Sequence, residues 1–102
     1  INMSASSYRD LEVWQKAMDL VVSIYSLTKS FPDSERFGLT SQIQRAVVSI
    51  PSNIAEGHGR HGLREYLNHL SMDYGSLMEV DTQLQIADRL RYAEKSQVQS
   101  LV

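Results

Sequence analysis

The sequence predicts an all-α fold, an antiparallel up-down four-helix bundle that assembles into an oligomer. Three observations support this prediction. Apolar residues recur at steps of three and four along three long segments, short connections with proline or glycine separate these segments, and one segment carries more apolar surface than a single core face needs. We expect a single domain over 1–102, with helices near 8–30, 33–57, 62–90 and 94–102. We expect residues 1–6 to be disordered or foreign to the natural chain, and the fourth helix to be truncated.

Composition limits the classes of protein to which the chain can belong. Its 102 residues, 42% of them hydrophobic, are enough for one core. The absence of cysteine excludes disulfides and thiolate metal ligands. The formal net charge of −2 lacks the basic excess that is typical of a nucleic-acid-binding domain. Because the sequence contains no membrane-length apolar run and no signal pattern, we expect a cytoplasmic protein with no membrane partner.

The segment 8–30 has two apolar seams where a surface helix usually has one. The first seam contains Leu11, Trp14, Met18, Val21 and Tyr25, and the second contains Val13, Ala17, Leu20, Ile24, Leu27 and Phe31. A surface helix needs an apolar stripe only slightly wider than about 100°. A bundle of this size has no central position that would bury both seams, so we predict that the second seam contacts another subunit, although the sequence does not determine which seam faces which neighbour. Pro32 ends this helix, because a residue before proline avoids the helical region.

The segment 33–57 combines an apolar stripe with a row of polar side chains. The stripe contains Ile43, Val47, Ile50 and Ile54, and the row contains Gln42, Arg45, Ser49, Asn53 and Glu56. Pro51 lacks a backbone donor, so we expect a kink there, and the run from Gly57 to Gly59 should end the helix. We assign Gln42, Ser49, Asn53 and Glu56 a structural role: Asn53 would satisfy backbone groups near Pro51, and Glu56 would pair with Arg45 or Arg60. No nucleophile in the row has a base within reach, so we predict no catalytic residues and no enzyme activity.

We predict the longest helix over 62–90, with a length of about 40 Å at 1.5 Å per residue. Its apolar positions are Leu63, Leu67, Leu70, Tyr74, Leu77, Leu84 and Ala87. The pair Gly75-Ser76 interrupts the pattern, at a cost of about 1 kcal/mol for the glycine in an isolated helix. Small residues at this point favour the close approach of another helix. After a turn, Val98, Leu101 and Val102 give the fourth segment a short apolar face.

Two groups of residues are candidates for binding. His61, Glu65 and His69 are one helical turn apart and could hold a divalent metal, although neither Glu56 nor Glu65 has the histidine three residues later that di-iron bundles use. We therefore expect no metal and no cofactor. The second group is basic and could contact phosphates or an acidic partner. It lies near a glycine-rich segment whose backbone N–H groups are accessible to an anion. It consists of Arg60 and Arg64, with Arg45 or Arg36 nearby.

Several strings of residues resemble one known family. They are Leu11-Glu12-Val13-Trp14, Gly38-Leu39-Thr40-Ser41-Gln42, Ser49-Ile50-Pro51-Ser52-Asn53-Ile54-Ala55-Glu56-Gly57 and Gly75-Ser76-Leu77. Over roughly 8–92, the chain resembles the four-helix-bundle proteins encoded in intervening sequences of bacterial 23S rRNA genes, whose relatives include the accessory variability proteins of diversity-generating retroelements. The resemblance implies an up-down bundle that assembles as a homopentamer, with no established catalytic activity. It also implies nucleic-acid or reverse-transcriptase binding for the retroelement relatives, which are more basic than this chain.

Two hypotheses about function follow. The first is a non-enzymatic homo-oligomeric scaffold or adaptor that binds RNA or an RNA-handling protein. The alternative is a small-molecule-binding or metal-binding helical bundle with an unrecognised activity. Salt-dependent retention of RNA would favour the first, whereas bound metal that is lost in His61→Ala would favour the alternative.

Overall fold

The computed structural model describes residues 7–58, 63–99 and 101. Every regular element in this part of the chain is a helix, which confirms the all-α class. The elements are the 3₁₀ helix η2 (Tyr8–Asp10), α1 (Glu12–Thr28), the 3₁₀ helix η3 (Asp33–Glu35), α2 (Leu39–His58), α3 (Leu63–Arg89) and α4 (Lys95–Gln99). None of the helices in the described ranges is long and apolar enough to cross a membrane.

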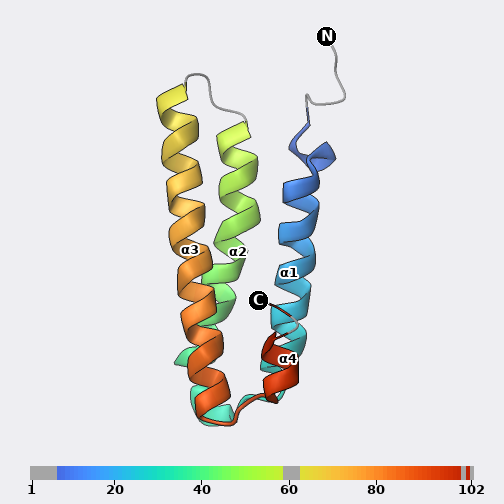
Figure 1. Ribbon diagram of the computed structural model, residues 1–102, viewed down its shortest axis with the longest axis vertical. Helices are drawn as coiled ribbons and strands as arrows, with labels where there is room; N and C mark the ends of the chain where they lie inside the picture. Colours follow the sequence, from blue (N-terminus) through green and yellow to red (C-terminus); the bar gives the residue numbers. More distant parts are fainter. Residues whose placement is uncertain (1–6, 59–62, 100, 102) are drawn as a thin grey trace.

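The three long helices lie alongside one another, and α2 contacts both α1 and α3 (Figure 1). The chain direction alternates from α1 to α2 to α3, and the short α4 lies beside α1 at the end where α3 finishes. The molecule is elongated, 49 × 23 × 21 Å, because the 27 residues of α3 alone span about 40 Å. The fourth helix covers only one end of the long helices, so a complete up-down four-helix bundle stays a prediction.

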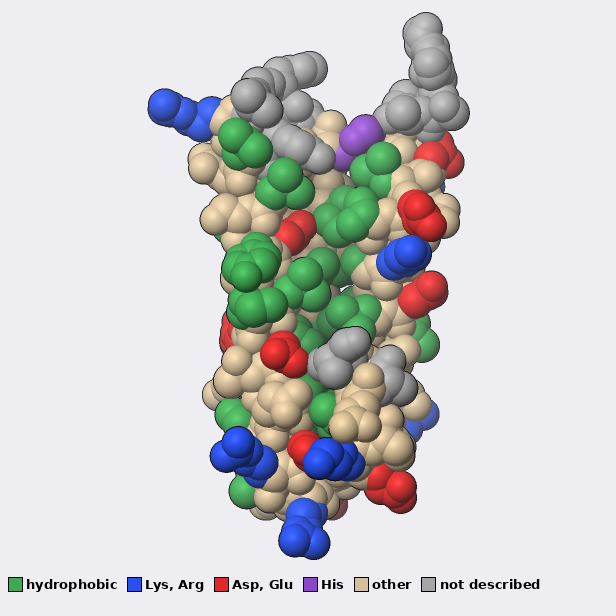
Figure 2. Space-filling model, viewed as in Figure 1, with side chains coloured by type: hydrophobic (Ala, Val, Ile, Leu, Met, Phe, Trp, Pro, Cys, Tyr) green, Lys and Arg blue, Asp and Glu red, His purple; other side chains and the backbone are tan. Residues whose placement is uncertain are grey.

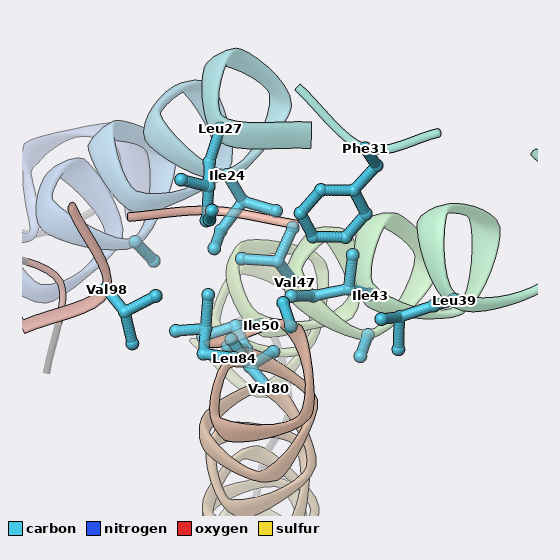
Figure 3. Close-up of a cluster of buried hydrophobic side chains, with 14 residues drawn as sticks. Ile24, Leu27, Phe31, Leu39, Ile43, Val47, Ile50, Val80, Leu84 and Val98 are labelled. Carbon is cyan, nitrogen blue, oxygen red and sulfur yellow. The ribbon is translucent and has the colours of Figure 1, made fainter. Parts of the chain in front are cut away.

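The hydrophobic core lies where the three long helices meet α4. Its most deeply buried residues come from all four, among them Ile24 in α1, Ile43 in α2, Leu84 in α3 and Val98 in α4 (Figure 3). The second seam of α1 supplies four members of this core: Ala17, Ile24, Leu27 and Phe31, just after the helix. The prediction that this seam contacts another subunit is therefore wrong. Periodicity revealed two seams, but it did not show which of them α2 would cover.

Helix α2 continues through Pro51, and the predicted segment 33–57 consists of η3 followed by this one long helix. Glu35 holds the start of α2 to the turn between α3 and α4. Its Oε1 accepts a hydrogen bond from the backbone N–H of Leu39 at 2.9 Å, and its Oε2 accepts one from the Tyr92 hydroxyl at 2.8 Å. These two bonds, the one from Leu39 foremost, lower the pKa of Glu35, and the bond to Glu35 raises the pKa of Tyr92.

The turn after α3 is a Schellman motif with an unusual residue at its centre. Arg91 has a left-handed backbone, with φ at 63°. The N–H of Tyr92 donates to the carbonyl of Ala87 at 2.9 Å, and the N–H of Arg91 donates to that of Asp88 at 3.0 Å. The Tyr92 ring lies 5.6 Å from that of Phe31, and its carbonyl accepts a bond from Ser30 Oγ at 2.8 Å. The turn is thereby fixed against the end of α1.

The helices approach closely at Gly57, whereas the sequence indicated Gly75. A Cβ added at Gly57 would lie 3.0 Å from the Cβ of His69, which is tighter than most Cβ contacts in proteins. A Cβ added at Gly75 would meet nothing within 4 Å, so the predicted close approach at that residue is wrong. Its neighbour Ser76 does contact α2, because the Ser49 hydroxyl donates to Ser76 Oγ at 2.9 Å. Helix α2 ends at His58, within the run from Gly57 to Gly59 that was predicted to end it, and Gly57 itself is buried.

Candidate functional site

A groove of about 380 Å³ lies between α2 and α3 and reaches the first residues of α1. We call it the central groove. Its apolar lining residues are Leu11, Val13, Ile50, Ile54, Leu70, Tyr74 and Leu77, and its other lining residues are Asn53, Gly57, His58, His69 and Asp73. Figure 2 looks onto the face between α3 and α1, where hydrophobic side chains and histidine lie together. An apolar cavity of this size with a few converging polar groups is typical of a binding site.

Asp73 is the most unusual side chain in the central groove. Only 8% of the residue is exposed, although aspartate is almost never buried without a partner. The side chain of Asn53 in α2 forms a hydrogen bond with Asp73. The Oδ1 atom of Asp73 nevertheless has no hydrogen-bond partner among the described residues. Burial raises the pKa of Asp73 against the opposing effects of Asn53 and the nearby His69. A buried acceptor without a donor is costly, so this position favours a ligand that can donate a hydrogen bond.

His69 lies between the two helices, where the absence of a side chain at Gly57 makes room for it. Its Nδ1 is 3.7 Å from Glu56 Oε1, and within the described ranges this nitrogen also lacks a hydrogen-bond partner. The imidazole is therefore placed near two carboxylates, Glu56 and Asp73. The groove can accept a hydrogen bond from a ligand, and the carboxyl group of Asp73 gives it an acidic rather than a basic character.

The residues of the predicted polar row have different partners. Ser49 bonds across to α3, and Asn53 bonds to Asp73, which the row did not include. Glu56 lies beside His69, whereas Arg45 is eleven residues earlier on a continuous helix, about 16 Å away along the axis. Gln42 is exposed. The row thus contributes Asn53 to the groove lining, Glu56 lies beside the lining residue His69, and Ser49 joins α2 to α3 outside the groove.

The predicted basic residues do not form one patch. Arg36 follows η3 and precedes α2, whereas Arg64 is in the first turn of α3, past the opposite end of α2. The 20 residues of α2 separate these two positions by about 30 Å. Arg45 lies between them along α2 and is exposed, although it belongs to the polar row beside the apolar stripe. Arg60 lies outside the described residues.

Of the three predicted metal ligands, only His69 has a described side chain, since His61 and the side chain of Glu65 lie outside the described part. No group of three or more histidine and acidic side chains suited to a metal ion occurs among the residues that the structure describes. His69 is instead a neighbour of Asp73, a residue that our reading of the sequence missed. The available signal was its position, three residues after Leu70 and four before Leu77, which places a carboxylate on the apolar stripe of α3.

The fold and the groove define a class: small all-helical proteins in which long helices pack side by side around an apolar groove that contains a few polar groups. Comparison with protein families then identifies the family. The family described as 23S rRNA-intervening sequence protein matches residues 9–102, and the chain belongs to it. A comparison with curated proteins gave no match. The relation to the accessory variability proteins of diversity-generating retroelements stays a prediction.

Proposed function

We propose that this protein is a non-enzymatic, homo-oligomeric scaffold or adaptor of the cytoplasm that binds RNA or an RNA-handling protein. The observation that carries the proposal is the apolar surface that the single chain leaves uncovered. A hollow of about 400 Å³, distinct from the central groove, is lined by η2, by the first seam of α1 and by α2: Tyr8, Trp14, Met18, Val21, Val48, Pro51, Ser52 and Ala55. We call this surface the α1–α2 face. Contiguous apolar surface of this kind usually marks a site of association.

The α1–α2 face supports self-association. Met18 and Val48 are 39% and 38% exposed, and the next residue of the same seam, Tyr25, is 43% exposed. A second copy that covers these side chains would remove apolar area from water, which is the main driving force for association. The resemblance described above implies five copies, so we propose a homopentamer.

Light scattering tests the assembly. We expect a mass five times the 11.6 kDa of the chain at micromolar concentration. Met18→Glu combined with Val48→Glu should reduce the mass to that of one chain and leave the helical circular dichroism intact, because both side chains are already partly exposed. Gln85→Glu, at an exposed position of α3, adds the same kind of charge elsewhere and should leave the assembly unchanged. A wild-type protein that is monomeric under these conditions would contradict the proposal.

Contact with RNA would be electrostatic and largely independent of sequence. The candidate residues are the exposed Arg36, Arg45 and Arg64, together with Arg60, and arginines of this kind contact phosphates. Because they are spread along the molecule and the net charge is −2, one chain should bind RNA weakly. Repetition of the same residues in an oligomer would raise the overall affinity through multivalency.

An RNA-binding titration from about 50 mM to about 200 mM salt tests this contact, since phosphate contacts weaken steeply over that range. Arg60→Glu combined with Arg64→Glu should weaken binding of all structured RNAs alike and preserve helicity and oligomer size. Arg45→Glu should also preserve the fold, because Arg45 is exposed. Lys29→Glu combined with Lys95→Glu, both at exposed positions, serves as a charge-matched control. If the wild type binds no structured RNA even at low salt, the RNA part of the proposal fails and a protein partner remains.

A further inference from the structure

We propose that the turn between α3 and α4 is the docking site for an acidic segment of a partner protein. The site is a hollow of about 740 Å³, lined by Ser30 after α1 and by residues between Asp88 and Gln97. We call it the turn hollow. The inference rests on the adaptor role proposed above and names the chemistry of the protein that it recruits. The turn hollow shares no lining residue with the central groove or with the α1–α2 face.

Three exposed cations line the turn hollow: Arg89, Arg91 and Lys95. None of them forms an ion pair within the part of the chain that the structure describes. Figure 2 shows Lys and Arg side chains gathered at this end of the molecule, at the bottom of the view. Arginine presents a planar fork of N–H donors that matches the two oxygens of a carboxylate. The hollow is therefore suited to carboxylate groups of a ligand.

Arg91 indicates that this charge serves binding rather than folding. Its φ of 63° is strained for a residue with a Cβ, and glycine is the usual residue at this position of a Schellman motif. Strained residues of this kind cluster at functional sites. The chain thus keeps an arginine where glycine would be more stable, and that arginine lines the turn hollow.

The frame of the turn hollow is held in place by bonds within the chain. The carbonyl of Tyr92 accepts a hydrogen bond from Ser30 Oγ, and its hydroxyl donates one to Glu35 Oε2, both at 2.8 Å. At the start of α4, the N–H of Glu94 donates to Gln97 Oε1 at 3.0 Å. A fixed frame lowers the cost of ordering that binding has to overcome. The cations are therefore presented on a preorganised turn.

Two carboxylates in the same hollow favour a peptide over RNA as the occupant. Asp88 and Glu94 line it beside the cations. They would repel the continuous row of phosphates of an RNA chain. An acidic peptide brings separate carboxylates for the arginines and backbone N–H groups that Asp88 and Glu94 can accept.

The position of the turn hollow also suits an adaptor. Arg64, which we propose to contact RNA, is 25 residues before Arg89 on the same helix, about 38 Å away along the axis. A protein partner at the turn hollow would not compete with RNA at Arg64. One chain could then hold both at once.

The test uses the full chain and two synthetic peptides. One has glutamates spaced by glycine and serine, and the other has glutamine in place of each glutamate. Fluorescence anisotropy at low salt should show saturable binding of the glutamate peptide and at least about tenfold weaker binding of the glutamine peptide. Arg89→Gln combined with Arg91→Gln should weaken binding of the glutamate peptide by a similar factor. Lys16→Gln combined with Arg45→Gln removes two exposed cations outside the hollow and should leave this affinity unchanged.

Arg91→Gly separates binding from folding. It should raise the melting temperature, because glycine adopts a φ of 63° without strain. It should also weaken binding of the glutamate peptide, because it removes one cation from the hollow. A melting temperature that falls in Arg91→Gly would show that the arginine serves the fold and would overturn the inference.

Three binding results would also overturn it: no saturable binding of the glutamate peptide, equal affinity of the wild type for both peptides, or an equal loss in the two double variants. RNA retention that Arg89→Gln with Arg91→Gln abolishes, without peptide binding, would assign the hollow to RNA instead. We expect these two substitutions to leave RNA retention unchanged, and Arg60→Glu with Arg64→Glu to leave peptide binding unchanged. Failure of the RNA proposal and failure of this one are therefore distinguishable.

Discussion

At the scale of single residues, the surroundings of Asp73 determine how it responds to pH. Burial raises its pKa above the ordinary value of 3.8, so the folded state holds this proton more tightly than the unfolded state does. Asp73 therefore costs no stability when the pH is well below 3.8, and its cost grows as the pH rises from that value through the folded-state pKa. The groove contains a carboxylate that is unfavourable for the fold at neutral pH, as residues that serve binding often are.

Asp73→Asn should consequently raise the melting temperature at pH 7, because it removes the buried charge but keeps an oxygen that can accept the bond from Asn53. The gain should shrink as the pH falls and vanish well below pH 3.8, where the wild-type carboxyl is protonated in both states. Thermal melts of both proteins across this range measure the difference. A gain that is constant with pH would mean that the charge is not its cause.

Two glycines in helices predict opposite responses to the same substitution. Alanine normally stabilises a helix interior by about 1 kcal/mol relative to glycine. Gly75→Ala should realise this gain, since its Cβ enters open space. Gly57→Ala should not, and should destabilise, because its Cβ would lie 3.0 Å from that of His69. Urea unfolding of the two variants provides the measurement, and an equal gain in both would contradict the close packing at Gly57.

The two glycines also show where the sequence was informative at this scale and where it was not. Both were visible as helix interruptions, but the sequence alone could not show which one faces another helix. Asn53 and Glu56 were recognised as a pair of polar residues one turn apart, yet their partners Asp73 and His69 come from α3. Polar contacts between helices depend on rotation about each helix axis, and periodicity does not determine that rotation to within one residue.

At the scale of elements, Glu35 connects the beginning of α2 with the end of α3. Because hydrogen bonds lower its pKa, its contribution to stability is present above its ordinary value of 4.5 and is lost as the pH falls through the folded-state pKa. Glu35→Ala should lower the melting temperature at pH 7, and the difference from wild type should diminish below pH 4.5. Asp33→Ala, on the same 3₁₀ turn, is the control and should have a smaller effect. An equal loss at every pH would show that the ionised form is not involved.

The two seams of α1 predict two different consequences of an added charge. Ile24 is fully buried in the core, so Ile24→Asp should unfold the chain, whereas Met18→Glu on the partly exposed seam should leave it folded. Burying an unpaired charge costs several kcal/mol, comparable to the whole stability of a small domain. Circular dichroism of both variants decides the point. A helical, folded Ile24→Asp protein would contradict the core described here.

At the scale of the whole molecule, the helical class and its three long segments followed from the sequence, because their apolar steps of three and four are regular over many turns. The predicted first helix, 8–30, corresponds to η2 and α1, and the predicted third, 62–90, to α3. The arrangement of the basic residues did not follow. Arg36 and Arg64 appeared close because the segments that carry them are neighbours in the sequence, but the intervening α2 places them near its opposite ends. The sequence alone did not show that one long helix would separate these two residues in space.

The order in which the helices pack has a consequence for the speed of folding. Each long helix packs against the next one in the chain, α1 on α2 and α2 on α3, and α3 then contacts α4. Most tertiary contacts therefore close short loops, which cost little chain entropy, and helical proteins with such low contact order fold in microseconds to milliseconds. Because α2 takes part in both long pairings, either hairpin can form first and then recruit the remaining helix. We therefore expect two parallel folding routes, of which a substitution in α1 or α3 slows one and leaves the other open, whereas a substitution in α2 affects both.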